Sequence, residues 1–231
     1  MRFLTFEQAS EYIRGRSVAL VGSAPTCLEN LPGFIDEHEV VVRVNNYKVD
    51  SADGPLGRRT DIHYSFYGNS IRKSVHELKR DGVKLCWCKC PNSKPLESVW
   101  HERHKKMNGI DFRYIYDLRR DWWFCDTYVP QAEQFLKHFT LLNRHVPTTG
   151  FAALLDILAC EPRSVYMTGF DFFESGIHNV NEHWRAGDPT DPIGHAPMRE
   201  FAWLREHAHL YPIQFDAALT QRLVQKEVAT A

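Results

Sequence analysis

The stretch VPTTGFAALLDILACEPRSVYMTGFDFF, residues 146–173, combines a helix signal and a strand signal in direct succession. The part that follows Thr149 is apolar nearly all round, as in helices that are buried in a core. RSVYMTGF (163–170) is near-continuous in apolar character, as in strands that are covered on both faces. A buried helix that leads into a buried strand is typical of α/β folds. This stretch therefore predicts a helix-strand unit of a layered α/β domain.

The expected helix begins with many small polar groups. Thr148, Thr149 and Gly150 stand where its free N–H groups and the positive end of its dipole would be exposed. The two hydroxyls and the glycine would allow close contact with an anion, so a phosphate or a carboxylate would fit there. The alternative is a plain N-cap, because the side chain of Thr148 or Thr149 could satisfy the helix end by itself.

Four further segments have strand character, and helical patterns lie between them. The strands are expected at SVALVG (17–22), EVVVRV (39–44), DIHYSF (61–66) and VKLCWC (83–88). SIRKSVHELKRDG (70–82), with its terminal glycine, is a helix candidate. Alternation of this kind predicts an α/β fold with a mostly parallel central sheet flanked by helices. We expect the whole chain, 1–231, to form a single domain.

The bulk composition limits the function classes. The chain has 231 residues, of which 43% are hydrophobic, and a formal net charge of -1. Such a chain has no global field that would attract nucleic acid, so nucleic-acid binding is disfavoured. No apolar run approaches the roughly 18 residues of a membrane span, and MRFLTFEQASEYIRGR (1–16) lacks the basic-then-apolar order of a secretion signal. We therefore expect a cytoplasmic protein.

The six cysteines are scattered along a chain that is too long to need a disulfide framework, which is typical of a reducing compartment. Three of them form CWCKC (86–90), and His101 and His104 follow, so a zinc site is an alternative. Structural zinc usually uses C-x2-C pairs, whereas the alternation along a strand sends side chains to opposite faces. The spacing therefore favours a strand with small buried thiols.

Ligands of parallel sheets bind beyond the carboxyl ends of the strands, so the turns after the expected strands are candidate binding sites. After the first strand comes GSAPTCL, in which Gly22 and Ser23 could let a backbone approach a ligand. The G-x-G-x-x-G fingerprint is missing, which disfavours a nicotinamide-dependent oxidoreductase. After the second strand come Asn45 and Asn46, whose amides could read a base or a ribose. Taken singly, each segment could also be an ordinary turn.

Four segments together resemble the sialylmotifs of sialyltransferases, in the order of that family. PTTGFAALLDILACEPRSVYMTGFDFF (147–173) is similar to the small sialylmotif. SVALVGSAPTCLENLPGFIDEHEVVVRVNNYKV (17–49), with its glycine turn and its Arg-x-Asn, resembles the large one. NEHWRAG (181–187) is similar to the short aromatic and histidine motif, and GHAPMRE (194–200) contains the His-x4-Glu of the very small motif. Bacterial sialyltransferases of a separate family also share an Asn-rich turn and an Ile-Gly-His before a helix.

The resemblance implies a Rossmann-like, GT-A-type glycosyltransferase that uses a CMP-activated nonulosonic acid and needs no metal or other cofactor. By position, it assigns donor contacts to Gly22, Ser23, Asn45, Thr148, Thr149, Gly150, Gly169 and Phe170. The helix start would hold the donor's phosphate or carboxylate, and the other residues would contact the CMP moiety. His195 would be the general base, and His183 would lie near the acceptor or the leaving phosphate. Glu200 completes the His-x4-Glu pair, but a carboxylate in a first helical turn could also simply favour the dipole.

The residue types fit this chemistry. Transfer needs a base that takes the proton of the acceptor hydroxyl, and a histidine that is neutral near pH 7 can supply it. His195 precedes an expected helix whose apolar face is marked by Phe201, Leu204 and Ala208. The positive end of that helix favours the neutral imidazole. We therefore expect an inverting, metal-independent transferase with His195 as its base.

Three departures from the family pattern matter. The large motif commonly has Gly-Asn where this chain has Gly22-Ser23, so one amide contact with the donor is missing, and the donor sugar is either sialic acid or Kdo. The disulfide that joins the two large motifs of vertebrate enzymes cannot form, because Cys160 matches one partner but Val18 takes the place of the other. The chain also lacks the membrane anchor and stem of the Golgi enzymes, which predicts a bacterial, cytoplasmic enzyme.

The expected acceptor is a hydroxyl of a bacterial surface glycan or glycolipid, as in polysaccharide biosynthesis. HERHKK (101–106) could attract an anionic lipid-linked acceptor and bring the protein to the inner face of the membrane, or it could be a solvated helix face. DLRRDWWFCDTY (117–128) sets arginines beside aromatics and is a candidate lid, around 117–130, or a packed loop anchored by Trp122 and Trp123. The rival function is a catalytically degenerate CMP-binding protein of the same fold.

Overall fold

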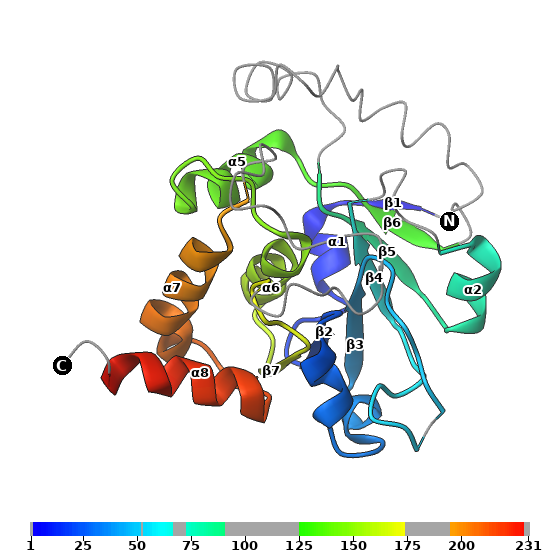
Figure 1. Ribbon diagram of the computed structural model, residues 1–231. Coiled ribbons are helices and arrows are strands. Elements are labelled where there is room, and N and C mark those ends of the chain that lie inside the picture. The colour runs from blue at the N-terminus through cyan, green and yellow to red at the C-terminus, as the bar shows by residue number, and fades with distance from the viewer. Residues whose placement is uncertain (1, 52, 67–72, 91–124, 174–194, 229–231) are drawn as a thin grey trace.

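The computed structural model describes residues 2–51, 53–66, 73–90, 125–173 and 195–228 (Figure 1). The described strands form one sheet in the order β1-β6-β5-β4-β3-β2-β7-β8, and every neighbouring pair is parallel. Their bounds are β1 Phe3–Leu4, β2 Ser17–Val21, β3 Val40–Val44, β4 Ile62–Ser65, β5 Leu85–Cys88, β6 Asp126–Tyr128, β7 Ser164–Thr168 and β8 Ile213–Phe215. The predicted α/β fold with a parallel central sheet is confirmed.

Helices connect the strands and cover both faces of the sheet. Their bounds are α1 Phe6–Ser10, α2 Val75–Arg80, α5 Ala132–Leu141, α6 Thr149–Ala159, α7 Pro197–His207 and α8 Ala217–Val228. Short 3₁₀ turns lie at η1 Pro25–Glu29, η2 Phe34–Glu37 and η4 Ala208–Leu210. In Figure 1, α1, α6, α7 and α8 lie to one side of the sheet and α2 lies to the other.

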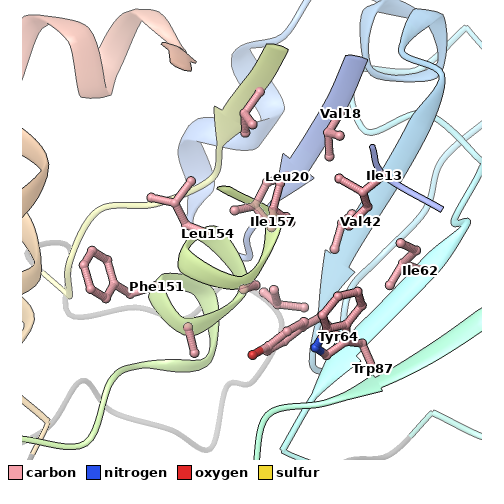
Figure 2. Packing of buried hydrophobic residues seen from close by; sticks show 14 of the residues in the cluster. Ile13, Val18, Leu20, Val42, Ile62, Tyr64, Trp87, Phe151, Leu154 and Ile157 are labelled. Atoms are coloured by element: carbon pink, nitrogen blue, oxygen red, sulfur yellow. The ribbon is translucent and has the colours of Figure 1, made fainter. Parts of the chain in front are cut away.

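The main core lies between the sheet and α6. Figure 2 shows Ile157 of α6 beside Leu20 of β2, whereas Phe151 of the same helix points away from the strands. Leu154 belongs to the same core. The strand residues of this core that the figure labels are Val18, Leu20, Val42, Ile62, Tyr64 and Trp87. Since α6 buries apolar groups on most of its surface, it packs firmly against the sheet and fixes where its own first turn lies.

One carboxylate interrupts this apolar contact. Asp156 of α6 is 2% exposed. It accepts hydrogen bonds from the Tyr64 hydroxyl at 2.6 Å and from Gln134 Nε2 at 2.7 Å. Burial raises the pKa of Asp156, and the nearby His138 opposes that rise. These polar contacts tie α6 to β4 and α5 at a defined register, because a buried carboxylate without partners would be costly.

The strands and helices that were predicted agree with the structure except at their ends. The five predicted strands correspond to β2, β3, β4, β5 and β7, each with ends within two residues of the expected ones. The helix predicted at 70–82 is shorter in the structure, because α2 begins only after Ser74. Ser74 and Glu77 form a capping box there: the Ser74 hydroxyl accepts from Glu77 N–H, and the Glu77 side chain accepts from Ser74 N–H. The short strands β1, β6 and β8 and the helices α1, α5 and α8 were not predicted.

The two pairings that complete the sheet join distant parts of the chain. β1 pairs with β6, with Phe3 opposite Thr127. β2 pairs with β7, with Ser17 opposite Ser164. β2 therefore has its sequence neighbour β3 on one side and a strand from the second half of the chain on the other.

Candidate functional site

The candidate site lies at the carboxyl edge of the sheet, where β2 and β7 are neighbours. The segment after β2 leads to β3 on one side, whereas the segment after β7 leads towards β8 on the other side. The two connections diverge at this point, which is the switch point where ligands of open parallel sheets bind. The turns that leave β2 and β7 are the ones that contain Gly22 and Gly169.

Gly22 and Gly169 make a backbone contact that leaves no room for a side chain. Gly22 N–H donates to the carbonyl of Thr168 at 2.8 Å, and Ala24 N–H donates to the carbonyl of Gly169 at 2.9 Å. A Cβ atom on Gly22 would stand 2.2 Å from the Gly169 oxygen, and Gly169 itself has a φ of +76°. The two turns are therefore locked together at a distance that only glycine permits.

The Phe170 ring joins this pair of turns to the start of α6. A Cβ atom on Gly150 would lie 2.1 Å from Cε1 of Phe170, and a Cβ atom on Gly22 would lie 3.0 Å from its Cε2. The structure thus brings together Gly22, Gly150, Gly169 and Phe170, which come from three separate segments of the predicted donor site. The ring packs over the glycines and forms one wall of the switch point.

Two polar residues that the sequence interpretation missed hold the β7 turn. Asp216 accepts hydrogen bonds from the Thr168 hydroxyl at 2.9 Å and from Gly169 N–H at 3.0 Å. Its other oxygen accepts from Leu219 N–H at 2.8 Å and so caps α8. Asn30 donates to the Thr168 hydroxyl at 3.1 Å. The signal for Asp216 was its place directly before a helical pattern.

Asn45 lies at the carboxyl end of β3, beside the β2 turn. It has a φ of +50°, in the left-handed region that asparagine tolerates better than most residues. Its carbonyl pairs with His63 Nε2 at 2.8 Å, and its side-chain oxygen accepts from the Ser65 hydroxyl at 3.2 Å. The amide of Asn45 is thereby oriented by β4, and Asn45 and Ser23 are both half-buried at this edge.

The start of α6 is capped by Thr148 and by a glutamate from another helix. The Thr148 hydroxyl accepts from Phe151 N–H at 3.2 Å and donates to Glu200 Oε2 at 2.7 Å. Thr148 N–H donates to Glu200 Oε1 at 2.6 Å. The hydroxyl of Thr148 thus has a capping role, and Thr149 and Gly150 are the residues whose N–H groups best suit an anion.

Glu200 is a buried acid whose protonation is finely balanced. It lies in the first turn of α7 and is 1% exposed. Burial raises its pKa to about 7, against the opposing effects of the two hydrogen bonds from Thr148 and of the positive charge of Lys89. Its role is therefore more than favouring the dipole of its own helix, because it holds the N-cap of α6 across the site.

His195 is held by a backbone carbonyl of the segment that leads into α6. Its Nδ1 lies 2.7 Å from the carbonyl oxygen of Val146. A carbonyl can only accept, so the proton of a neutral His195 ring is on Nδ1 and the basic lone pair is on Nε2. This is the tautomer that a general base at Nε2 needs.

The His-x4-Glu spacing has a clear physical reason in this structure. His195, just before α7, binds Val146, and Glu200, one turn into α7, binds Thr148. Two side chains at one helix start thus hold two positions in the segment that leads into α6. The packing of Phe151 against Trp203, edge to face at 5.4 Å between ring centroids, supports the same junction. The candidate base and the candidate anion site are therefore fixed relative to each other.

Several predicted features lie outside the described residues. They include His183 with its motif at 181–187, the basic segment 101–106, and residues 117–124 of the candidate lid with Trp122 and Trp123. The remainder of that lid segment begins with Cys125, and residues 126–128 form β6 within the sheet.

The cysteines are buried thiols wherever the structure describes them. All six lie within the described ranges, are buried and form no disulfide, and Cys86, Cys88 and Cys90 share one cluster with Cys125, whose Sγ lies 3.4 Å from that of Cys86. Within the described ranges, no group of three or more His, Cys, Asp or Glu side chains is placed to hold a metal ion. In that same part of the chain, no helix is both long and apolar enough to cross a membrane.

Several solved structures that share this architecture are sialyltransferases. A mammalian sialyltransferase in complex with Gal-beta-1-3GalNAc-ortho-nitrophenol matches with a TM-score of 0.55 and 18% identity, over 90% of this chain and 72% of that one. The alpha-2,3-sialyltransferase of Campylobacter jejuni in apo form matches with 0.53 and 13% identity, over 93% of this chain and 79% of that one. The C. jejuni sialyltransferase CstII in complex with cytidine-5'-monophosphate gives 0.52 and 16%, over 88% and 80%.

The TM-scores show a shared fold, and at these low sequence identities they show the fold alone. No protein-family model matches the chain, and no curated protein sequence matches it significantly. The chain thus has the α/β architecture of sialyltransferases with a sequence that has diverged far from theirs.

Proposed function

We propose that this protein is an inverting glycosyltransferase that moves a nonulosonic acid from a CMP-activated donor to a hydroxyl of a glycan or glycolipid. The observation that carries the proposal is the junction in which His195 binds Val146 and Glu200 binds Thr148. It sets a basic histidine nitrogen beside a helix start that can hold an anion. The shared fold with sialyltransferases, one of them solved with cytidine-5'-monophosphate, supports the same reading.

The donor's nucleotide is assigned to the switch point between β2 and β7. The contact between Gly22 and Gly169 leaves only backbone there, and the Phe170 ring offers an apolar wall for a ribose or a base. Asn45 and Ser23 supply polar groups at the same edge. The N–H groups of Thr149 and Gly150 would hold the donor's phosphate or carboxylate.

The reaction then follows from the positions of the base and the anion site. His195 Nε2 accepts the proton of the acceptor hydroxyl while the acceptor oxygen bonds to the anomeric carbon of the donor sugar. The bond from that carbon to the phosphate oxygen breaks, and CMP leaves with the electron pair. The positive end of the α6 dipole stabilises the negative charge, so the step needs no metal ion. Attack from the side opposite the leaving CMP inverts the anomeric centre.

The finer assignments extend this proposal. Sialic acid and Kdo are both CMP-linked 2-keto acids and present the same anomeric carboxylate, so either fits the α6 start. We assign the protein to the bacterial cytoplasm, at the inner face of the membrane, with a surface polysaccharide or glycolipid as acceptor. The segment at 101–106, outside the described residues, is the candidate for membrane contact.

Nucleotide binding tests the pocket, and donor turnover tests the enzyme. CMP at about 100 times its dissociation constant should raise the unfolding free energy by about 2.7 kcal/mol, whereas UMP and AMP at the same concentration should do less. Equal stabilisation by AMP and CMP would contradict the nucleotide assignment. CMP release from CMP-sialic acid or CMP-Kdo, with mixed acceptors, separates a transferase from the rival catalytically degenerate CMP-binding protein, which would bind CMP without turnover.

A further inference from the structure

The hydroxyl of Thr168 lies at the end of β7, next to the two turns to which we assign the nucleotide. Thr168 is the last residue of that strand and is 0% exposed. Its hydroxyl donates to Asp216 Oδ2 at 2.9 Å and accepts from Asn30 Nδ2 at 3.1 Å. One buried hydroxyl thus joins a residue from the first part of the chain to a residue near its end.

On one side this link reaches the β2 turn through Asn30. Asn30 directly follows η1, the 3₁₀ turn into which the Gly22 turn leads. Its NH₂ group also donates to the carbonyl of Cys27 at 2.6 Å, and its oxygen accepts from the Tyr166 hydroxyl at 2.5 Å. Because both ends of the amide are bound, Asn30 has a fixed orientation and holds η1 against β7.

On the other side the link reaches Gly169 and α8 through Asp216. The Oδ2 atom that binds Thr168 also accepts from Gly169 N–H at 3.0 Å, and Oδ1 accepts from Leu219 N–H at 2.8 Å. Asp216 is 5% exposed, so a lost partner would be costly there. Thr168 therefore connects η1, the β7 turn and the start of α8.

The conformation of Gly169 depends on such partners. Glycine is the most flexible residue, and Gly169 has a φ of +76°, so its neighbours must hold it in place. Its carbonyl accepts from Ala24 N–H of the β2 turn, and the Phe170 ring follows it in the chain. A shift of Gly169 would therefore alter both the contact between the turns and the apolar wall of the nucleotide site.

We infer that Thr168 is a positioning residue for the nucleotide, because its hydroxyl holds the β2 turn and the β7 turn at the spacing that CMP needs. The inference rests on the proposed function, which assigns CMP to this place. Since Thr168 is fully buried, it acts through Asn30 and Asp216. If the turns separate part of the time, the apparent affinity for CMP decreases in proportion to the closed fraction. A threonine that served stability alone would lower the melting temperature and leave the CMP affinity of the folded protein unchanged.

Four variants test this role. Thr168→Val removes the hydroxyl and keeps a branched side chain, whereas Thr168→Ser keeps the hydroxyl and removes the methyl group. Asn30→Ala breaks the same link from the β2 side, at a half-buried position. Thr127→Val is the matched control, because Thr127 is also a buried strand threonine, 8% exposed, and belongs to β6 near the opposite edge of the sheet.

The first measurement is calorimetric titration of CMP into each folded protein, with melting temperatures taken on the same preparations. Thr168→Val should raise the Kd for CMP by about 10- to 100-fold, the range for a hydrogen bond to a charged group. Asn30→Ala should raise it as well, while Thr168→Ser and Thr127→Val should stay within about threefold of the wild type. An unchanged Kd in Thr168→Val, an equal rise in Thr127→Val, or a Thr168→Ser protein as weak as Thr168→Val would overturn the inference. Where Thr168→Val does not fold, Asn30→Ala decides by the same criterion.

Amide hydrogen exchange without nucleotide keeps this outcome separate from the fate of the proposed function. NMR follows Gly22 N–H and Ala24 N–H, whose acceptors are the carbonyls of Thr168 and Gly169. Both amides should exchange about 10-fold faster or more in Thr168→Val, and at the wild-type rate in Thr168→Ser and Thr127→Val. Absence of CMP binding by the wild type would defeat the proposed function, while the exchange rates would still decide whether Thr168 holds the turns together. Equal rates in Thr168→Val and the wild type would overturn the inference.

Discussion

Replacing Glu200 by glutamine should remove a defined part of the pH dependence of stability. In the folded protein burial raises the pKa of Glu200 from its ordinary 4.5 to about 7. Between these two values the unfolded chain has lost the proton while the folded protein still holds it, so folding becomes less favourable as the pH rises. The displacement corresponds to about 3 kcal/mol. This contribution is fully present below pH 4.5, decreases towards pH 7, and changes little above it.

Glutamine resembles the protonated acid and does not ionise. Its oxygen can accept from Thr148 N–H, and its amide can donate to the Thr148 hydroxyl oxygen. The difference in unfolding free energy between wild type and Glu200→Gln should therefore shift by about 2.5 kcal/mol in favour of the variant between pH 5 and pH 8, because the first part of the change occurs below pH 5. Other titrating groups are common to both proteins and cancel in the difference.

The assay is urea unfolding of both proteins at half-unit steps from pH 5 to pH 8. Glu133→Gln is the matched control, because Glu133 is an exposed acid in the first turn of α5, and its curve should run parallel to that of the wild type. Parallel curves for Glu200→Gln would refute the reasoning. A wild type that gains stability relative to Glu200→Gln with rising pH would show that the hydrogen bonds from Thr148 outweigh burial.

The other predictions concern the base, the glycine contact and metal ions. His195→Ala should lower turnover by about 10²- to 10⁴-fold with little change in CMP affinity. His207→Ala is the control, because it removes a ring that also bonds a backbone carbonyl, and it should leave turnover unchanged. Near-normal turnover in folded His195→Ala would exclude His195 as the base. Gly22→Ala should lower the free energy of unfolding by about 1–3 kcal/mol and abolish stabilisation by CMP, because its methyl group would lie 2.2 Å from the Gly169 oxygen. Gly15→Ala is the comparison in the same melting assay, because its methyl group would meet nothing within 4 Å and only the φ of +68° opposes the substitution. Transfer should survive EDTA, and complete loss that manganese restores would point to another transferase class.

The parts of the fold that the sequence predicts are those with a local signal. β2, β3, β4, β5 and β7 have four or five residues each and are rich in apolar side chains, so each strand stands out from the sequence around it. β1, β6 and β8 have only two or three residues, too few for any periodicity. They form because a neighbouring strand already offers free backbone groups, which is a tertiary effect.

The residues of the candidate site also divide into those with a local signal in the sequence and those without one. Gly22, Gly169 and Thr149 could be predicted because they occupy the turn after a strand or the start of a helix, where their local chemistry has a known use. The bond between Glu200 and Thr148 joins positions 52 residues apart, and no local pattern reports such a pairing. Lys89 lies within CWCKC, where the cysteines suggested either a zinc site or a strand with buried thiols. No local pattern predicted that the charge of Lys89 acts on Glu200.

The proposed nucleotide site is complete only after β2 has paired with β7, which is a late step of folding. The partner strands lie more than half the chain apart, so closing this pairing carries a large loop entropy, and parallel sheets of such high contact order fold slowly. During synthesis, β2 can dock only on β3 until β7 has left the ribosome, and its other edge is then open to wrong partners. Gly22 meets Gly169 only when that edge closes. If CMP binds there as proposed, it binds the closed form alone and would therefore also favour the completion of folding.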